Sequence, residues 1–136
     1  GISIGGLAMA ESALAHTIEY VKERKAFGKP IAGFQNTQFK IAEMHTKLEV
    51  ARAYVDRCLE LHLKKELDIP TAAAGKYYIT DLQCEVIDEC LQLHGGYGYM
   101  WEYPIARMFA DSRVQRIYGG TNEIMKGIVA KAVLAD

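Results

Sequence analysis

Residues 41–62 carry the pattern that most restricts the fold of this chain. Apolar or small side chains recur there at alternating spacings of three and four residues over about six helical turns. This spacing places them on one face of a helix, so we expect a long amphipathic helix whose stripe faces a protein core. The stripe consists of Ile41, Met44, Leu48, Ala51, Val55, Cys58 and His62.

Three other segments repeat this spacing and predict three more helices. A further short helix is expected from about Ile105 to Arg116, and Gly119 and Gly120 break the chain after it. No segment shows clear alternation with the period of two that strands require. We therefore predict an all-α fold, an antiparallel four-helix up-and-down bundle with an extra short helix, in a single domain of residues 1–136. The three stripes are Leu7, Ala10, Leu14, Ile18 and Val21; Ala73, Tyr77, Thr80, Cys84, Ile87, Leu91 and His94; and Ile124, Ile128, Val129 and Val133.

Capping residues mark several helix ends. Asp68 and Pro70 suit the N-cap and first turn of the third helix, which should form a hairpin with the second. Gly28 is expected to stop the first helix, and one of the glycines Gly95 and Gly96 to stop the third. Thr121 can cap the last helix through its side-chain oxygen.

The composition limits the classes of function. The chain has 136 residues, of which 50% are hydrophobic, and a formal net charge of -1. These values suit one soluble domain and provide no overall field that would attract nucleic acid or an anionic membrane. No apolar run approaches the ~20 residues that span a bilayer. Because the predicted first helix begins almost at Gly1, we expect the sequence to be the C-terminal piece of a longer chain.

Metal sites and nucleophile motifs are disfavoured by residue spacing. Cys58 with His62 and Cys90 with His94 stand at i, i+4, but in an antiparallel hairpin the two pairs would be displaced by roughly 20 Å, so we reject a zinc site. No glutamate precedes a histidine by three residues, as a bundle di-iron site requires, and no GxSxG elbow occurs. Three cysteines without CxxC fit a reducing compartment.

The segment "ERKAFGKPIAGFQ" is the first of three clusters suited to a phosphate-bearing ligand. Arg24 ends the first helix, Phe27 and Gly28 follow, and Gln35 begins the second helix. A cation at a helix C-terminus also complements the helix dipole, so a purely structural role stays open for the charge. It does not explain the neighbouring Phe27. A guanidinium that holds a diphosphate beside an aromatic ring would explain both.

The other two clusters combine doubled glycines with helix ends. In "QLHGGYGY", one glycine suffices to cap the helix, so the second is free to let a ligand approach the backbone, with Gln92 one turn away. His94 lies on the helical stripe and is expected to be packed and hydrogen-bonded. In "GGTNEI", the N-terminus of the last helix offers N–H groups to anionic or carbonyl oxygens, although a Gly-Gly turn with a threonine cap is the simpler alternative.

Taken together, the three clusters resemble the C-terminal helical domain of the acyl-CoA dehydrogenase family. The segments "ERKAFGKPIAGFQ", "LQLHGGYGYMWEYPIARMFADSRV" and "IYGGTNEI" match in order and spacing, from about Leu7 to the end. Within the family, "HGGYGYMWEYPIAR" with "IYGGTNEIMK" is most similar to the long-chain branch. The resemblance implies FAD as cofactor and a fatty acyl-CoA as substrate.

The resemblance also implies roles for individual residues. Arg24, Phe27 and Gln35 are expected to contact the FAD of a neighbouring subunit, and the segment Gln92–Gly96 to approach its diphosphate and adenosine end. The last helix would bind FAD at its N-terminus, and Gly119 with Gly120 would lie beside the substrate thioester. The implied cofactor-binding residues are Arg24, Phe27, Gln35, Gln92, Leu93, His94, Gly95, Gly96, Thr121, Asn122 and Glu123.

Gly119 stands where many family members carry their catalytic base, the glutamate of "YEGT". Members with glycine there take the glutamate from the start of the first helix of this domain, a position just upstream of Gly1. Glu11 and Glu123 match neither position. In the family the carboxylate removes the α-proton of the thioester as the β-hydride moves to the flavin, which gives the trans-2-enoyl-CoA. We therefore expect the isolated chain to be inactive.

The resemblance leaves two rival roles open. The helical domains of the family form the centre of a tetramer, a dimer of dimers, so the chain could serve assembly alone. A divergent homologue could instead bind a nucleotide or a partner without catalysis. For an active parent enzyme, the resemblance implies electron-transfer flavoprotein as electron acceptor, and the bacterial cytoplasm or the mitochondrial matrix as compartment.

Overall fold

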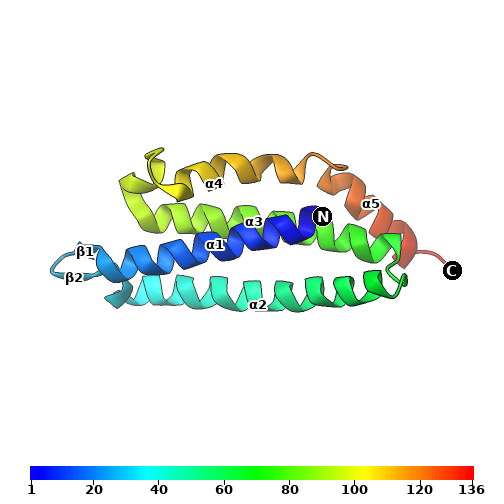
Figure 1. Cartoon of the computed structure of the whole chain (residues 1–136), viewed down its shortest axis with the longest axis horizontal. Coiled ribbons are helices and arrows are strands. Elements are labelled where there is room, and N and C mark those ends of the chain that lie inside the picture. The colour runs from blue at the N-terminus through cyan, green and yellow to red at the C-terminus, as the bar shows by residue number, and fades with distance from the viewer.

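The computed structural model describes all residues, 1–136, and confirms the all-α prediction (Figure 1). Three long helices are followed by two shorter ones, and a minimal antiparallel hairpin joins the first two helices. None of the helices combines the length and the apolar character needed to cross a bilayer. The elements are α1 (Ile2–Glu23), β1 (Lys25–Ala26), β2 (Lys29–Pro30), α2 (Gln35–Leu63), α3 (Ile69–His94), α4 (Pro104–Ser112) and α5 (Asn122–Val133).

The core lies where α1, α2 and α3 meet, and most of the predicted stripe residues of α1 and α2 are buried there. The α2 stripe ends earlier than predicted, because Cys58 is only half-buried and His62 is exposed near the end of the helix. Cys90 packs on Met44, with 3.7 Å between their sulfur atoms. Met44 precedes Cys58 by fourteen residues, or about 21 Å of helix, so the two Cys/His pairs are far apart, as predicted.

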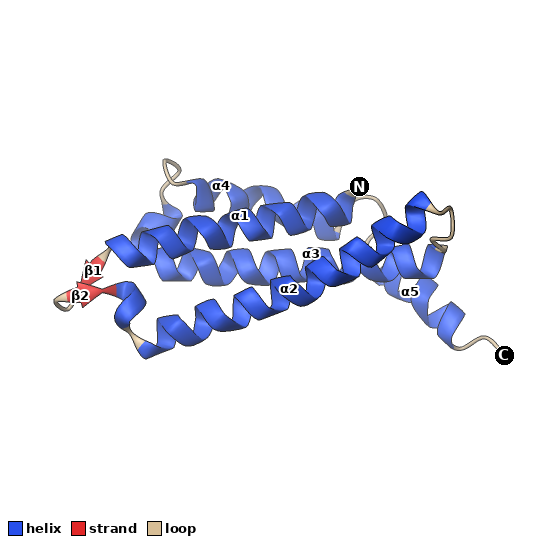
Figure 2. Cartoon of the chain, turned by 60° about the horizontal axis from the view of Figure 1, so that its bottom comes forward, coloured by secondary structure: helices blue, strands red, loops and turns tan.

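The third helix, α3, is central to the fold and buries more of its surface than one stripe. It packs against α1, α2, α4 and α5, and in Figure 1 it lies between α2 and α4. Figure 2 shows α5 beside the N-terminal end of α3. For this reason its buried residues surround much of the helix and include polar side chains. They are Ala73, Gly75, Lys76, Ile79, Thr80, Leu82, Gln83, Val86, Ile87, Cys90 and His94.

The predicted caps of α3 and α5 are confirmed. The Asp68 carboxylate accepts a hydrogen bond from the Thr71 N–H at 2.8 Å, and the Thr121 hydroxyl oxygen accepts one from the Ile124 N–H at 3.3 Å. Gly95 ends α3 with a φ of 60°. Each side-chain cap satisfies one N–H group that the first turn of a helix leaves unpaired.

Two local predictions were wrong. Gly28 does not stop α1, which ends at Glu23; it lies at the tip of the β1–β2 hairpin. Phe27 and Gly28 both have positive φ, 53° and 84°, as a two-residue hairpin turn requires. The short helix also ends early, at Ser112, and continues as a 3-10 helix over Arg113–Arg116.

Candidate functional site

One hollow joins the first two sequence clusters at the end of the bundle that carries the hairpin. The last turn of α1 supplies Arg24 and Tyr20, and the end of α3 supplies the segment 92–96, about seventy residues further on. The hollow measures about 530 Å³. The structure therefore brings together the arginine and the doubled glycine that the sequence singled out. Its lining is Tyr20, Arg24, Ile31, Gln92, Leu93, His94, Gly95, Gly96, Tyr97 and Met100.

Arg24 is exposed and keeps its charge available to a ligand. Its guanidinium carbon lies 5.2 Å from the centre of the Tyr97 ring, a cation–π contact that orients the side chain without neutralising it. Beside it, Gly95 needs its left-handed φ of 60° to end the helix. A Cβ on Gly96 would meet nothing within 4 Å, so this backbone faces open space into which a ligand fits.

His94 supports the hollow from inside the bundle. Only 6% of the residue is exposed, its Nδ1 lies 2.8 Å from the Cys90 carbonyl oxygen, and its ring stacks on that of Tyr20 at 4.2 Å. Burial lowers the pKa of the imidazole below its usual value, although the Cys90 carbonyl opposes this. The predicted packed, hydrogen-bonded histidine is confirmed.

The hairpin presents Phe27 at the same end of the molecule. The residue is 97% exposed, and its ring meets the Phe34 ring edge-on at 6.3 Å. The positive φ of Phe27 belongs to the hairpin turn, and the turn leaves the ring almost wholly in solvent. Gln35 follows Phe34 as the first residue of α2 and is exposed.

The third cluster forms a different site at the opposite end of the bundle, beside the N-terminus of α1 (Figure 1). Gly119 and Gly120 have φ values of 67° and 90°. The N–H groups of residues 119–121 donate no hydrogen bond within the chain, and those of Asn122 and Glu123 lie in the first turn of α5, where helices leave them unpaired. Five successive N–H groups therefore have no acceptor within the chain.

Contacts around the two glycines leave little room for side chains. A Cβ on Gly119 would lie 2.4 Å from Cδ1 of Ile2, and one on Gly120 would lie 2.6 Å from Cε of Met125. Gly119 therefore sits directly against the start of α1. The nearest acidic side chain on α1 is not available there, because the Glu11 carboxylate is paired with the guanidinium of Arg52.

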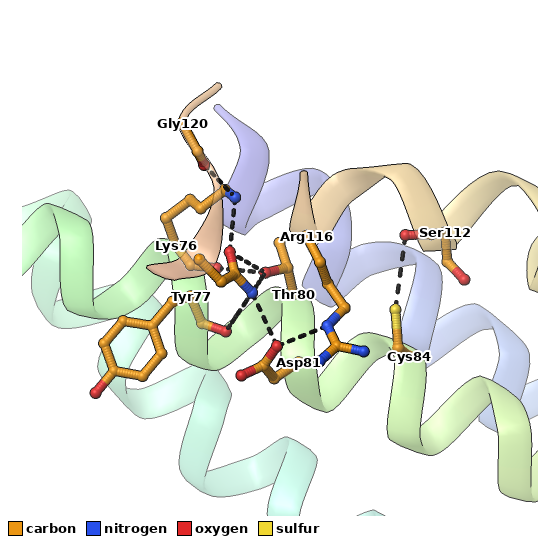
Figure 3. Close-up of polar contacts among 9 residues, drawn as sticks. Lys76, Tyr77, Thr80, Asp81, Cys84, Ser112, Arg116 and Gly120 are labelled. Atoms are coloured by element: carbon orange, nitrogen blue, oxygen red, sulfur yellow. Dashed lines mark hydrogen bonds and ion pairs between the residues drawn. The ribbon is translucent and has the colours of Figure 1, made fainter. Parts of the chain in front are cut away.

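A buried polar network fastens this loop to α3 (Figure 3). The Lys76 ammonium donates to the Gly120 carbonyl at 2.8 Å and to Oδ1 of Asn122 at 2.7 Å. Nδ2 of Asn122 donates in turn to Thr80 Oγ1 at 2.9 Å and Asp81 Oδ1 at 2.8 Å. Asp81 also accepts a hydrogen bond from Nε of Arg116 at 2.8 Å, and this bond connects the segment before Gly119 to α3.

The network includes residues that the sequence interpretation missed. Only 3% of the whole Asn122 residue is exposed, because its side chain is hydrogen-bonded to α3, and its contact with a cofactor stays a prediction. Lys76 and Asp81 were not predicted, because nothing in their spacing distinguishes them from surface charges. The sequence did contain one signal for the burial of Lys76: it lies between Ala73 and Tyr77, two residues of the predicted apolar stripe.

The two sites are well separated. Lys76 and Gln92 lie sixteen residues apart on one helix, which corresponds to about 24 Å. The predicted cofactor-binding residues therefore fall into two groups. One group lies around Arg24, Phe27, Gln35 and residues 92–96, and the other comprises residues 119–123.

Known proteins share this sequence and fold along almost the whole chain. The profile of the family described as "Acyl-CoA dehydrogenase, C-terminal domain" matches residues 1–134. The mouse long-chain specific acyl-CoA dehydrogenase, a mitochondrial protein, is 52% identical over 130 residues, which cover 96% of this chain and 30% of the mouse protein. The chain belongs to the acyl-CoA dehydrogenase family. It spans about a third of the length of such relatives.

Solved structures of acyl-CoA dehydrogenases share the fold closely. The enzyme from Geobacillus kaustophilus superimposes with a TM-score of 0.96 at 42% identity, covering 98% of this chain and 35% of that one. A glutaryl-CoA dehydrogenase from Mycobacterium smegmatis, determined in complex with FADH2, has a TM-score of 0.96 at 27% identity and covers 100% of this chain and 35% of its own. The predicted family and its helical C-terminal domain are confirmed.

Proposed function

We propose that this chain is the FAD-binding and assembly domain of a flavin-dependent acyl-CoA dehydrogenase that acts on fatty acyl-CoA thioesters. The proposal rests on one observation: Arg24, Gly95 and Gly96 line the same hollow. An exposed guanidinium beside open glycine backbone fits the diphosphate of FAD. The exposed aromatic ring of Phe27 offers a surface for a flat ring system.

The site at residues 119–123 fits the other part of the reaction. Its N–H groups point to a ligand rich in oxygen acceptors, such as the flavin ring or a thioester carbonyl. Bound FAD supplies the hydride acceptor of the proposed oxidation. The chain's own contribution is to hold the reacting groups and to keep water away from them.

The contact between Gly119 and Ile2 supports the proposed source of the catalytic base. Because α1 begins directly beside Gly119, a glutamate carried immediately before Gly1 would lie close to that glycine. Such a carboxylate would remove the α-proton of the substrate as general base. Ile2 occupies the space beside Gly119, so a glutamate side chain at position 119 would collide with it.

The separation of the two sites supports action as an oligomer. A single FAD seated against residues 119–123 would need to reach about 24 Å along α3 to touch Gln92. We therefore propose that the hollow at Arg24 receives the FAD of a second subunit. Electron-transfer flavoprotein is the proposed electron acceptor.

Assembly is supported separately by an apolar face on α2 and α3. Val50 and Tyr78 are 60% and 47% exposed, and with Tyr54, Ala74 and Tyr77 they line a shallow hollow of about 250 Å³ without any charged side chain. Exposed apolar surface of this kind is typical of interfaces between subunits. The assembly role and FAD binding use different surfaces of the chain.

Arg24→Met tests the FAD site in the dehydrogenase that contains this domain. We expect the dissociation constant for FAD to rise about 10- to 100-fold, because one charged hydrogen bond to a phosphate contributes about 1.5 to 3 kcal/mol. Titration of apoprotein with FAD measures this. Lys22→Met, an equivalent change at an exposed lysine of the same helix end, is the control. Equal affinities for the wild type and the Arg24 variant would contradict the proposal.

A further inference from the structure

Lys76 is a buried cation in an electrostatically unfavourable place. It is 6% exposed, and both of its hydrogen-bond acceptors, the Gly120 carbonyl and the Asn122 side-chain oxygen, are uncharged. It also lies under the N-terminus of α5, the positive end of that helix dipole. Burial lowers the pKa of the Lys76 ammonium, and the charges of Asp81 and Glu123 offset this only in part.

Packing alone does not require a charge here. An apolar side chain of similar length would fill the space without desolvating an ammonium group, and buried ionic groups are frequently no more stabilising than apolar replacements. Burial of the ammonium therefore costs free energy, and its hydrogen bonds to uncharged acceptors offset only part of that cost. The charge does strengthen the hydrogen bond from Lys76 to the Gly120 carbonyl in the loop of residues 119–121.

The direction of that carbonyl fixes the direction of the next N–H group. The Gly120 C=O and the Thr121 N–H belong to one planar trans peptide and point in opposite directions. Since Lys76 draws the carbonyl toward α3, the Thr121 N–H points away from α3, and it has no acceptor in the chain. Two adjoining glycines with positive φ would otherwise leave this peptide free to rotate.

The rest of the network holds the loop on both sides of this peptide. Arg116, three residues before Gly119, is paired with Asp81, and Asn122 is bonded to Thr80 and Asp81. These anchors fix the ends of the loop, but neither of them sets the orientation of the peptide between Gly120 and Thr121. Among the hydrogen bonds from α3, the one from Lys76 reaches that peptide (Figure 3).

We propose that Lys76 is a positioning residue that aims the Thr121 N–H group at the ligand bound by residues 119–123 and adds positive potential there. The identity of the ligand as FAD rests on the proposed function. The orientation of the loop does not, because it follows from contacts within the chain. Lys76 itself lies behind the loop and is not expected to touch the ligand.

The first test measures the loop in the 136-residue chain by backbone amide NMR. In Lys76→Met we expect large shifts and line broadening of the Gly119, Gly120 and Thr121 signals, while signals from α1 and α2 stay in place. Lys126→Met removes an exposed lysine of α5 and serves as the matched control. Lys76→Gln retains an N–H donor without the charge and should give intermediate shifts.

The second test measures FAD binding by the complete dehydrogenase. We expect Lys76→Met to raise the FAD dissociation constant about 10-fold or more, the loss of one hydrogen bond held by a charged group. Removal of the nearby positive charge should also make the reduction potential of the bound flavin more negative, an effect that loss of stability alone would not produce. Lys126→Met should change neither quantity.

The outcomes separate the two proposals. Wild-type protein that holds no FAD would contradict the proposed function, and the NMR comparison would still decide the role of Lys76. Unchanged signals at residues 119–121 in folded Lys76→Met or Lys76→Gln would overturn the positioning role. Unfolding of both Lys76 variants would overturn it too, because Lys76 would then serve the fold as a whole.

Discussion

At the scale of single residues, each of the two sites lies beside a buried polar side chain of α3. His94 packs under the doubled glycine of the Arg24 hollow, and Lys76 lies beneath the glycines of the α5 loop. In both places a titratable side chain on α3 is buried and hydrogen-bonded to a backbone oxygen. The exposed backbone beside it is thereby kept in one conformation for binding.

The burial of His94 makes the stability of the chain depend on pH. Because its folded-state pKa lies below the unfolded value near 6.5, the unfolded chain binds the proton first as the pH falls. The stability due to the neutral imidazole is therefore complete above about pH 6.5 and decreases as the pH falls toward the lowered pKa. Urea unfolding of wild type and His94→Leu between pH 5 and 7.5 should show this component only in the wild type.

His45→Leu provides the control for this measurement, because His45 is exposed on α2. Its pH dependence should match that of the wild type. A wild-type profile that coincides in slope with the profile of His94→Leu would contradict the account given for His94.

At the scale of elements, α2 and α3 show how one hairpin serves two purposes. Their facing sides supply core residues such as Met44 and Ile79, whereas an adjoining face exposes Val50 and Tyr78. Ion pairs border this face, including Lys47 with Glu85. An apolar area with charged residues at its border is the usual composition of an interface between subunits.

Tyr78→Lys tests this face. A charge introduced there should weaken self-association, because the ammonium would have to be desolvated at the interface. We expect the oligomer to dissociate at protein concentrations where the wild type remains assembled, as measured by sedimentation or light scattering. Tyr99→Lys makes the same change at a tyrosine that is 86% exposed and should leave the assembly intact. Equal association of wild type and Tyr78→Lys would show that the interface lies elsewhere.

At the scale of the whole molecule, the two sites lie at opposite ends of one bundle. The hollow at Arg24 and the N–H groups at residues 119–123 are joined by the length of α3, about 24 Å between Lys76 and Gln92. This arrangement suits a subunit that completes the flavin site of its neighbour while it contributes to its own. It also means that neither site encloses a ligand within a single copy of this chain.

The isolated 136-residue chain should therefore have no acyl-CoA dehydrogenase activity and should bind FAD weakly or not at all. The exposed hollow leaves most of a bound flavin in water, and the acidic side chain on the nearby part of α1, Glu11, is paired with Arg52. Flavin absorbance after gel filtration and a dye-reduction assay with acyl-CoA check both expectations. A flavin-loaded, active preparation of these residues alone would refute them.

The sequence by itself determined the helices, their hairpin and the motifs of both sites. The signals were local: the spacing of apolar residues, Asp68 with Pro70, and the glycine pairs. Local hydrogen bonding and the direction of side chains are sufficient to interpret them. The same rules missed the β1–β2 hairpin, because a two-residue strand is too short to show alternation. They also did not predict the hydrogen bonds between Asn122 and α3, since a helix N-terminus does not reveal what packs beneath it.

Only the tertiary structure decided which distant residues meet. It placed α3 at the centre of the bundle, so that residues on several of its faces became buried and Lys76 came to lie under Gly120. It also brought Arg24 to Gly95 and Gly96 while it kept both far from Gly119. Helical periodicity predicts which face of a helix is buried. Whether a charged side chain is buried depends on every element that packs around it, and the sequence of one segment does not identify those elements.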